Sequence, residues 1–310
     1  MKPGADFTGL SCPAIVGPTA SGKTALVTAL ASQLPIEVIS LDSRQIYHGL
    51  RIGTAQPTAE ELAICPHHLI DFVSPDEKYD AVRFRSDFEK VFCEIKDRDG
   101  IAILAGGAGM YLTALRDGFM EIPGNSDEKL LEARAEVAAW DEKTLRDKLL
   151  QCDPESFERI HQNDVYRSQR AMEIFLISGR TMTALTAEQK PNPSLGLDFP
   201  AFVLQRSVEK LDERIALRTE LMLEQGWIEE TEDALKKHDP QGPGLRSIGY
   251  REIVEFLAGE LSRTDLAPAV ILVTRQYAKR QRTWFRNMEN AMEGHPESVE
   301  LLEGLLSSLA

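Results

Sequence analysis

The chain of 310 residues is 43 % hydrophobic and 27 % charged, which is typical of a soluble globular protein with one or two domains. It has no apolar run of about 18 residues, and its first residues lack the apolar stretch of a secretory signal, so we expect a cytoplasmic protein without membrane segments. The formal net charge of −14 argues against a uniformly basic nucleic-acid binder. RNA affinity depends on the local density of cations, however, so an acidic chain with one basic stripe is compatible with RNA binding.

Short apolar segments alternate with helical ones in the first part of the chain. We predict buried strands at residues 14–17, 36–41 and 101–105, the last ending in a glycine-rich turn. Helices are predicted at residues 26–33 and 111–115. Strands that alternate with helices favour a parallel sheet covered on both faces. We therefore expect an α/β fold.

The strand signals fade between residues 123 and 197, where the sequence is charged and helical. Helices are predicted at residues 127–140, 141–150 and 164–178, before a proline-rich loop at 190–193. A predicted strand at 201–205 and mainly helical sequence from residue 208 follow. We expect residues 12–122 and 198–310 to form one catalytic core, interrupted by a helical insertion at 123–197.

The four cysteines are widely scattered and include no CxxC pair, so we expect free thiols in a reducing compartment. They are Cys12, Cys65, Cys93 and Cys152. Cys65 lies near His67 and His68, but a zinc site would need a further ligand at suitable spacing. The simpler interpretation is a turn leading into a strand at residues 68–73.

Residues 17–24, GPTASGKT, match the pattern GxxxxGK[ST] between a predicted strand and a predicted helix. In such a loop the backbone N–H groups and the helix N-terminus surround phosphate oxygens. The Lys23 ammonium would contact the terminal phosphate, and the Thr24 hydroxyl is placed to ligate Mg²⁺. The phosphate site would comprise Gly17, Pro18, Thr19, Ala20, Ser21, Gly22, Lys23 and Thr24. The sheet is then of the P-loop NTPase type, although the motif leaves open whether it holds ATP, GTP or another diphosphate.

Asp42 directly follows the second predicted strand. In a doubly wound sheet, side chains at the carboxyl ends of strands face the ligand crevice beside the phosphate loop. Asp42 is therefore a candidate Mg²⁺ ligand or general base. The alternative is an aspartate that caps a helix.

Eight motifs along the chain resemble, in order, those of the tRNA dimethylallyltransferases. They are GPTASGKT (17–24), DSRQIY (42–47), IGTAQP (52–57), PHHLID (66–71), GGAGMY (106–111), NDVYRSQRAMEI (163–174), RSIGYRE (246–252) and RQYAKRQRTWFR (275–286). They span nearly the whole chain. A nucleotide kinase is not expected to carry the last block together with DSRQIY and PHHLID.

The resemblance implies that a dimethylallyl group passes from dimethylallyl diphosphate to N6 of the adenosine 3′ of the anticodon. The tRNAs would be those reading codons that begin with U, and the products N6-isopentenyladenosine and diphosphate. Lys23 and Arg214 would clamp the diphosphate with Mg²⁺ as cofactor, and Thr19 would contact the leaving oxygen. Asp42 would accept a proton from the adenine amine. This chemistry is reasonable because a departing diphosphate needs neutralisation and an exocyclic amine is a poor nucleophile.

The resemblance also implies which residues contact tRNA. They are Asp42, Ser43, Arg44 and Gln45 in DSRQ, Gln169, Arg170 and Ala171 in QRA, and in addition Ala108, Arg167 and Arg246. Arg167 and Arg170 would contact phosphates, unless they belong to an ordinary exposed helix face. The chain departs from the family at Gln56, where Lys is usual, and at Ala108, where Thr is usual.

A basic helix is predicted near the C-terminus. Arg275, Lys279, Arg282 and Arg286 are spaced by four, three and four residues, which places them on one helix face, and Arg280 lies beside them. Such a face binds RNA phosphates, although a merely solvated face is the alternative. Trp284 or Phe285 could stack on a base, or pack in the core.

We consider three functions: a Mg²⁺-dependent prenyltransferase acting on tRNA, a P-loop kinase or adenylate prenyltransferase, and an NTP-binding switch. The third is weak because no NKxD motif occurs.

The expected partners are a tRNA anticodon stem-loop and dimethylallyl diphosphate, with the protein a monomer. The target adenine would leave its stack to reach the catalytic site. Met110 and Met222 are candidates for a prenyl pocket, although buried methionine is more often plain core.

Overall fold

The computed structural model describes residues 7–188 and 195–309, which divide into two compact units. One unit contains residues 7–116 and 195–309, and the other contains residues 117–188. The predicted insertion at 123–197 overlaps the second unit.

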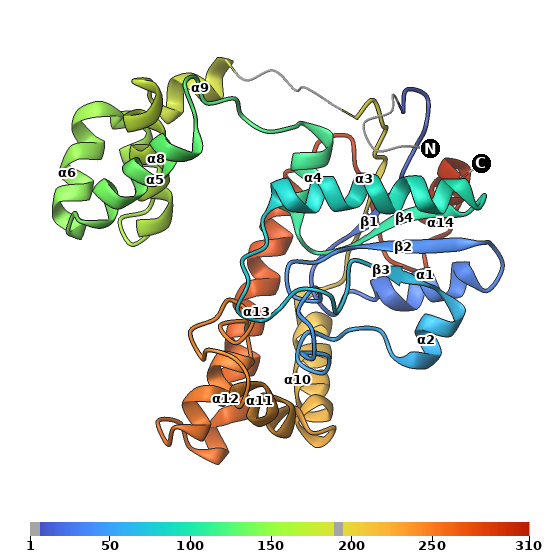
Figure 1. The fold of residues 1–310 in the computed structure, drawn as a ribbon. Helices are drawn as coiled ribbons and strands as arrows, with labels where there is room; N and C mark the ends of the chain where they lie inside the picture. The colour runs from blue at the N-terminus through green and yellow to red at the C-terminus, as the bar shows by residue number, and fades with distance from the viewer. Residues whose placement is uncertain (1–6, 189–194, 310) are drawn as a thin grey trace. The chain divides into compact units, whose positions relative to one another are not determined.

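The first unit is built on a parallel sheet of six strands in the order β3-β2-β4-β1-β5-β6 (Figure 1). The strands are β1 (Ala14–Val16), β2 (Ile36–Leu41), β3 (His67–His68), β4 (Ile101–Gly106), β5 (Ala201–Leu204) and β6 (Met292–Gly294). β1 is central, with Ala14 opposite Leu104 of β4 and Ala201 of β5. Strands covered on both faces are apolar nearly throughout, as the sequences of β1 and β5 show.

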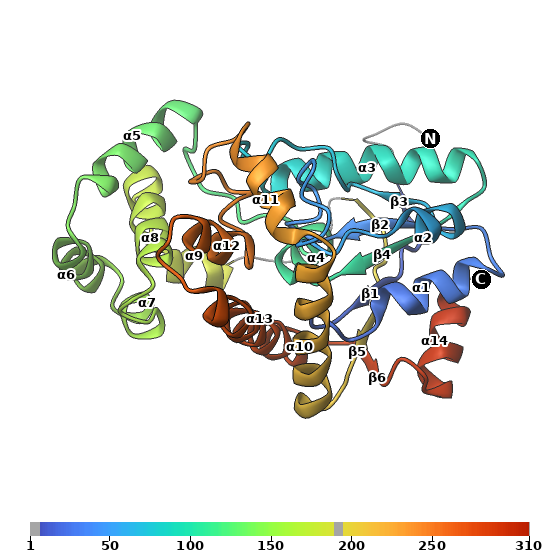
Figure 2. The same cartoon turned by 90° about the horizontal axis from the view of Figure 1, so that it is seen from below.

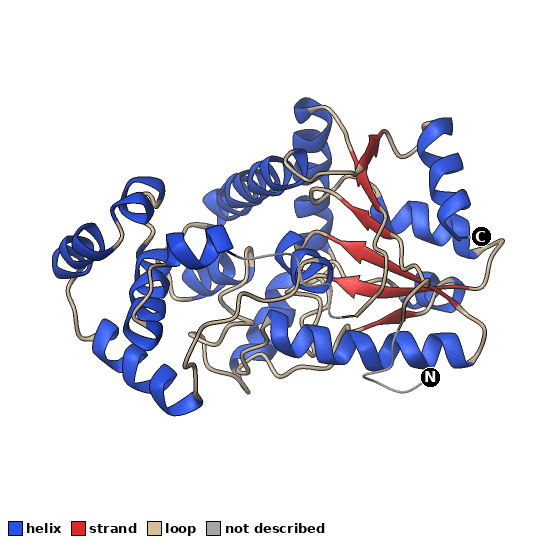
Figure 3. Ribbon diagram, turned by 90° about the horizontal axis from the view of Figure 1, so that it is seen from above, coloured by secondary structure: helices blue, strands red, loops and turns tan. Residues whose placement is uncertain are grey.

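Helices cover both faces of this sheet (Figure 3). The described helices of this unit are α1 (Lys23–Ala31), α2 (Ala59–Ile64), α3 (Ala81–Asp97), α4 (Gly109–Arg116), α10 (Val208–Glu224), α11 (Trp227–Leu235), α12 (Tyr250–Leu257), α13 (Arg263–Arg286) and α14 (Val299–Leu309). On one face, Phe84 and Phe88 of α3 pack with Leu41 and Leu104. On the other, α1 and α14 pack against strand residues such as Ile15.

Helices α10 to α13 form a group with a core of its own beside the carboxyl ends of the strands (Figure 2). Met222 of α10, Trp227 of α11, Tyr250 of α12 and Val270 of α13 meet there. The segment after β2 contributes Tyr47 to the same cluster. This packing fixes the helix group to the chain that carries the DSRQIY motif.

The second unit is helical. It contains α5 (Asp127–Ala138), α6 (Glu142–Cys152), α7 (Pro154–Arg159), α8 (Val165–Ser178) and α9 (Met182–Glu188). Leu145, Leu149, Ala171 and Met172 are among the residues of its core.

The predicted parallel sheet with helices on both faces is confirmed, and the predicted strands match β1, β2, β4 and β5 to within one residue. The strand predicted at residues 68–73 is wrong. Only His67–His68 pair with β2, because Leu69 and Asp71 adopt positive φ angles of 59° and 56° that end the strand. Helices α2, α3, α7 and α9 and strand β6 were not predicted. The proline-rich segment 190–193 lies outside the described residues.

The four cysteines are free thiols, as expected. Cys65, His67 and His68 have separate partners: the Cys65 thiol faces the Ile36 carbonyl, His67 contacts the Cys65 carbonyl, and His68 pairs with Glu37. Within residues 7–188 and 195–309, no helix has the length and apolar character needed to cross a membrane.

Candidate functional site

The turn between β1 and α1 has the backbone of a phosphate-binding loop. Gly17, Ala20 and Gly22 have φ angles of 149°, 64° and 106°. A Cβ atom at Gly17 would lie 2.8 Å from the Leu204 carbonyl oxygen, so the close approach to β5 requires glycine there. Gly22 precedes α1 and offers no side chain to cap it, so the first N–H groups of the helix are left for an anion.

Lys23 lies inside this loop. Its Nζ donates hydrogen bonds to the Gly17 and Pro18 carbonyl oxygens at 3.0 and 2.9 Å. Burial lowers the pKa of Lys23 to about 8, partly offset by the Asp42 carboxylate and reinforced by Arg218. The protonated form of Lys23 is therefore destabilised in the free site, and an anion bound beside it would stabilise it.

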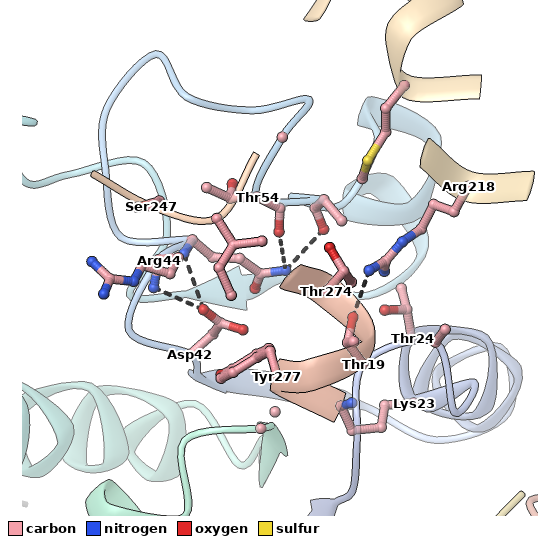
Figure 4. Close-up of a pocket in the computed structure, with 18 of the residues that line it drawn as sticks. Thr19, Lys23, Thr24, Asp42, Arg44, Thr54, Arg218, Ser247, Thr274 and Tyr277 are labelled. Carbon is pink, nitrogen blue, oxygen red and sulfur yellow. Dashed lines mark hydrogen bonds between the residues drawn. The ribbon is translucent and has the colours of Figure 1, made fainter. Parts of the chain in front are cut away.

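Arginines from the chain after β5 hold the loop residues in place. Arg214 Nε donates to the Ala20 carbonyl at 2.8 Å, and Arg218 Nη2 donates to Thr19 Oγ1 at 2.5 Å (Figure 4). Arg206 Nε donates to the Ser21 carbonyl at 2.8 Å. Burial lowers the pKa of Arg218 below its usual value. The sequence reasoning missed Arg206 and Arg218, although Arg218 lies four residues after Arg214, on the same face of α10.

Asp42 lies at the carboxyl end of β2, as expected. Its Oδ1 accepts hydrogen bonds from the backbone N–H groups of Arg44 and Gln45 at 2.7 and 3.3 Å. The second carboxylate oxygen points away from those groups (Figure 4). Asp42 therefore caps a turn and still presents one oxygen to the cavity.

A cavity of about 730 Å³ brings these groups together, a size suited to a small-molecule substrate. Of the predicted site residues, Thr19, Ala20, Gly22, Lys23, Thr24, Asp42, Ser43, Arg44, Gln45, Arg214, Arg246 and Arg280 line it. Met222, Trp227 and Val270 form an apolar part of its wall. Glu61 also lines the cavity, so cations, the Asp42 and Glu61 carboxylates and an apolar wall share one space.

Comparison with known proteins identifies the family. A family model described as IPP transferase matches residues 45–288. The chain belongs to the IPP transferase family. Proteins named tRNA dimethylallyltransferase from Azoarcus sp. (strain BH72) and Burkholderia thailandensis are 40 % and 41 % identical to it, over 93 % and 94 % of this chain and 89 % and 94 % of theirs.

Solved structures of IPP transferases share the fold. The tRNA isopentenylpyrophosphate transferase of Bacillus halodurans has a TM-score of 0.68 and 32 % identity, covering 96 % of both chains. A eukaryotic dimethylallyltransferase, described as acting on tRNA, has a TM-score of 0.76 and 29 % identity, covering 89 % of this chain and 70 % of its own. The expected family, P-loop-like fold and enzyme class of prenyltransferase are confirmed.

Side chains of the IPP transferase motif DSRQIY bond to the backbone of neighbouring loops. Arg44 Nη1 donates to the Pro243 carbonyl at 3.0 Å, and Gln45 Nε2 donates to the Ala55 carbonyl at 2.8 Å. Gln56, where the family usually has Lys, donates through Nε2 to the Gln45 carbonyl at 2.8 Å. The departure at Gln56 thus supports the turn after Asp42.

The basic face lies on α13, as predicted. Arg275, Lys279 and Arg286 are exposed, and Arg282 is partly exposed. Arg275 forms an ion pair with Asp212 at 3.3 Å, so its charge is partly compensated.

The two aromatic residues at the end of α13 differ in exposure. Phe285 is 1 % exposed and packs in the core, so its stacking on a base is ruled out by burial. Trp284 is 41 % exposed, and its indole lies so close to Gly109 that a Cβ atom there would be 2.1 Å from Nε1.

The structure places three further residues, Met110, Met222 and Ala108, and corrects the expectation for Met110. Met110 is 62 % exposed and lies outside the described lining of the cavity, so it is not a prenyl-pocket residue, whereas Met222 lines the cavity. Ala108, where the family usually has Thr, is partly buried, and its N–H donates to the Leu41 carbonyl at 2.9 Å.

In the second unit, the predicted RNA-binding residues lie on α8. Arg167 pairs with Asp164 at 3.5 Å, and Arg170 pairs with Glu173 at 2.9 Å. Gln169 is partly exposed. Ala171 is 2 % exposed and packs in the core of the unit, so the expected contact between its side chain and tRNA is corrected to a packing role.

Proposed function

We propose that the protein transfers the dimethylallyl group of dimethylallyl diphosphate to N6 of the adenosine 3′ of the anticodon in tRNA. One observation carries the proposal: Asp42, the phosphate loop and an apolar wall line the same cavity. The products would be N6-isopentenyladenosine and diphosphate. The names of the relatives support this substrate pair.

The diphosphate would bind to the loop N–H groups, Lys23, Arg214 and Arg218. Thr19 Oγ1 accepts a hydrogen bond from Arg218, so its own proton is available for donation to the oxygen that leaves with the diphosphate. Binding of the anion would also raise the pKa of Lys23, which burial has lowered.

The oxygen donors of the cavity fit Mg²⁺, which prefers oxygen ligands and keeps several waters. The Thr24 hydroxyl would hold the ion beside Lys23, since both residues line the cavity. Bound Mg²⁺ would supply charge neutralisation for the diphosphate.

The reaction breaks the bond between the allylic carbon and the diphosphate oxygen, and forms the bond between that carbon and N6. Asp42 would accept the amine proton through the oxygen that its two backbone N–H partners leave available. Met222, Trp227 and Val270 would pack against the apolar dimethylallyl group.

The adenosine would leave its stack to enter the cavity, where Arg246 and Arg280 lie among the lining residues. Lys279, Arg282 and Arg286 on α13, and Arg167, Gln169 and Arg170 on α8, would contact the surrounding tRNA. We propose further that the enzyme acts as a cytoplasmic monomer on tRNAs reading codons that begin with U.

Transfer of label from dimethylallyl diphosphate to an anticodon stem-loop tests the proposal, with AMP and ATP as control acceptors. Asp42→Asn is the sharpest variant, because an asparagine oxygen can still cap the turn while its basicity is lost. We expect label on the RNA and a loss of about a hundredfold or more in kcat for Asp42→Asn. Label on AMP instead of RNA would favour the nucleotide-directed alternative.

A further inference from the structure

Gln281 is a buried polar residue near the C-terminal end of the basic helix α13. It is 6 % exposed, and Arg280 and Arg282 flank it in the sequence. Its carboxamide makes two hydrogen bonds to segments far away in the chain. Oε1 accepts from the Thr19 N–H at 2.8 Å, and Nε2 donates to the Gly107 carbonyl at 3.1 Å.

This carboxamide is one step in a continuous series of hydrogen bonds across the site. The Gly107 N–H donates to the Leu41 carbonyl at 3.0 Å, and Leu41 directly precedes Asp42. Gln281 therefore connects the strand end that carries Asp42 to Thr19. The Thr19 side chain is held separately, by Arg218 of α10.

The geometry around Gly107 shows that the space is shaped for this side chain. A Cβ atom at Gly107 would lie 2.1 Å from Gln281 Nε2, so the carboxamide reaches the carbonyl only because residue 107 is glycine. The position also demands a group that both donates and accepts, which an amide provides and a carboxylate, ammonium or thioether does not. Burial makes each unmade hydrogen bond costly.

We propose that Gln281 is a positioning residue that sets the separation between Thr19 and Asp42. The inference rests on the proposed function, in which Thr19 contacts the leaving oxygen and Asp42 contacts the amine. In-line displacement requires both groups at fixed places, and small misplacements reduce the rate strongly. Gln281 belongs to α13, the helix whose basic face would contact the RNA. The separation between Thr19 and Asp42 would therefore depend on the position of α13.

The test is a double-mutant cycle between Gln281→Met and Thr19→Val. Methionine keeps the length and volume of glutamine but removes both hydrogen bonds. Thr19→Val keeps the backbone N–H that Gln281 holds and removes the hydroxyl whose place that contact would set. We expect Gln281→Met to lower kcat for the stem-loop by about ten- to a hundredfold. The Kd for inorganic diphosphate and for the stem-loop should change by less than about threefold, because the contacts to either ligand remain.

The cycle separates positioning from a general structural effect. If Gln281 acts through Thr19, its substitution in the Thr19→Val background should cost less than about threefold in kcat, because the losses are not multiplicative. Gln225→Met, at an exposed glutamine after α10, is the matched control and should leave kcat unchanged.

Two results would overturn the inference: an unchanged kcat in Gln281→Met, or losses that multiply in the double variant. Both results are measured against a wild-type chain that labels the stem-loop. They would therefore overturn the role of Gln281 and leave the proposed function intact. A wild-type chain that labels AMP and not RNA would overturn the proposed function, and the same cycle measured with AMP would then decide the role of Gln281.

Discussion

At the scale of single residues, the charge of Lys23 depends on what it binds. Its pKa of about 8 means that the free protein loses this ammonium as the pH rises through that value, well below the ordinary 10.5. Protonated Lys23 therefore destabilises the fold below this pH, and the cost disappears as the pH rises toward 10.5. A bound anion in the loop would instead stabilise the protonated form of Lys23 and raise its pKa.

We expect diphosphate binding near pH 9 to take up about one proton through Lys23. Calorimetric titration with inorganic diphosphate, in buffers of different ionisation enthalpy, measures the uptake. Lys23→Met removes this contribution but keeps the proton equilibria of the ligand itself. Equal uptake by the two proteins would show that Lys23 is already charged.

Arg218 offers a second prediction at this scale. Its contact with Thr19 Oγ1 holds the hydroxyl that, in the proposed mechanism, contacts the leaving oxygen. We expect Arg218→Met to reduce kcat/KM for dimethylallyl diphosphate by about a hundredfold, the effect typical of one lost donor to a developing anion. Lys210→Met, at an exposed cation paired with Glu213 on the same helix, is the control and should be nearly neutral. Similar kinetics for both variants would exclude a role for Arg218 in leaving-group departure.

At the scale of elements, Glu230 of α11 anchors the loop after DSRQIY. Its carboxylate accepts the backbone N–H groups of Arg51 at 2.8 Å and Ile52 at 2.9 Å, and also the Tyr250 hydroxyl at 2.5 Å. Burial and this carboxylate raise the pKa of Tyr250, so its hydroxyl stays protonated as a donor. The loop depends on an acceptor supplied by a distant helix.

We expect Glu230→Gln to destabilise the protein by about 1–3 kcal/mol, because the amide turns a donor toward groups that need an acceptor. For a unit of this size that lowers Tm by about 3–10 °C. Thermal unfolding measures the change, with the exposed neighbour Glu229→Gln as control. A Tm equal to that of the control would mean that the loop is held by other contacts.

The basic face of α13 predicts how RNA affinity varies with salt. Lys279→Ala and Arg282→Ala should each reduce the slope of log K against log salt by about 0.7–0.9, since each removes one phosphate contact. Arg275→Ala should have a smaller effect, because Asp212 already compensates its charge. Arg263→Ala, at the start of the same helix, is the control and should leave the slope unchanged. Unchanged slopes for Lys279→Ala and Arg282→Ala would identify a merely solvated face.

At the scale of the whole molecule, the two units have separate cores. The described core of the first unit is formed by residues 7–116 and 195–309. We therefore expect a chain in which a flexible Gly/Ser linker replaces residues 117–192 to fold and to bind inorganic diphosphate as the full chain does. Label transfer to the stem-loop should be lost if the helical unit supplies RNA contacts. Full transfer activity would show that the first unit alone recognises the RNA.

Much of the fold could be predicted because its signals are local. Buried parallel strands need continuous apolar runs, and those at residues 36–41 and 101–105 were found where β2 and β4 lie. Gly17 and Gly22 adopt positive φ angles that favour glycine, so the phosphate loop is marked in the sequence by the glycines themselves. Helix α3 was missed although its apolar spacing is regular, and β6 was missed because three residues carry too little pattern.

The sequence by itself therefore determined the sheet, the phosphate loop, Asp42 and the basic helix, since each follows from a local pattern of residues. Only the tertiary structure decided which distant side chains complete the site. Arg206, Arg218 and Gln281 reach the loop across sequence separations of 185, 199 and 262 residues. Such contacts depend on how α10 and α13 pack beside the strand ends, and no local periodicity encodes that packing.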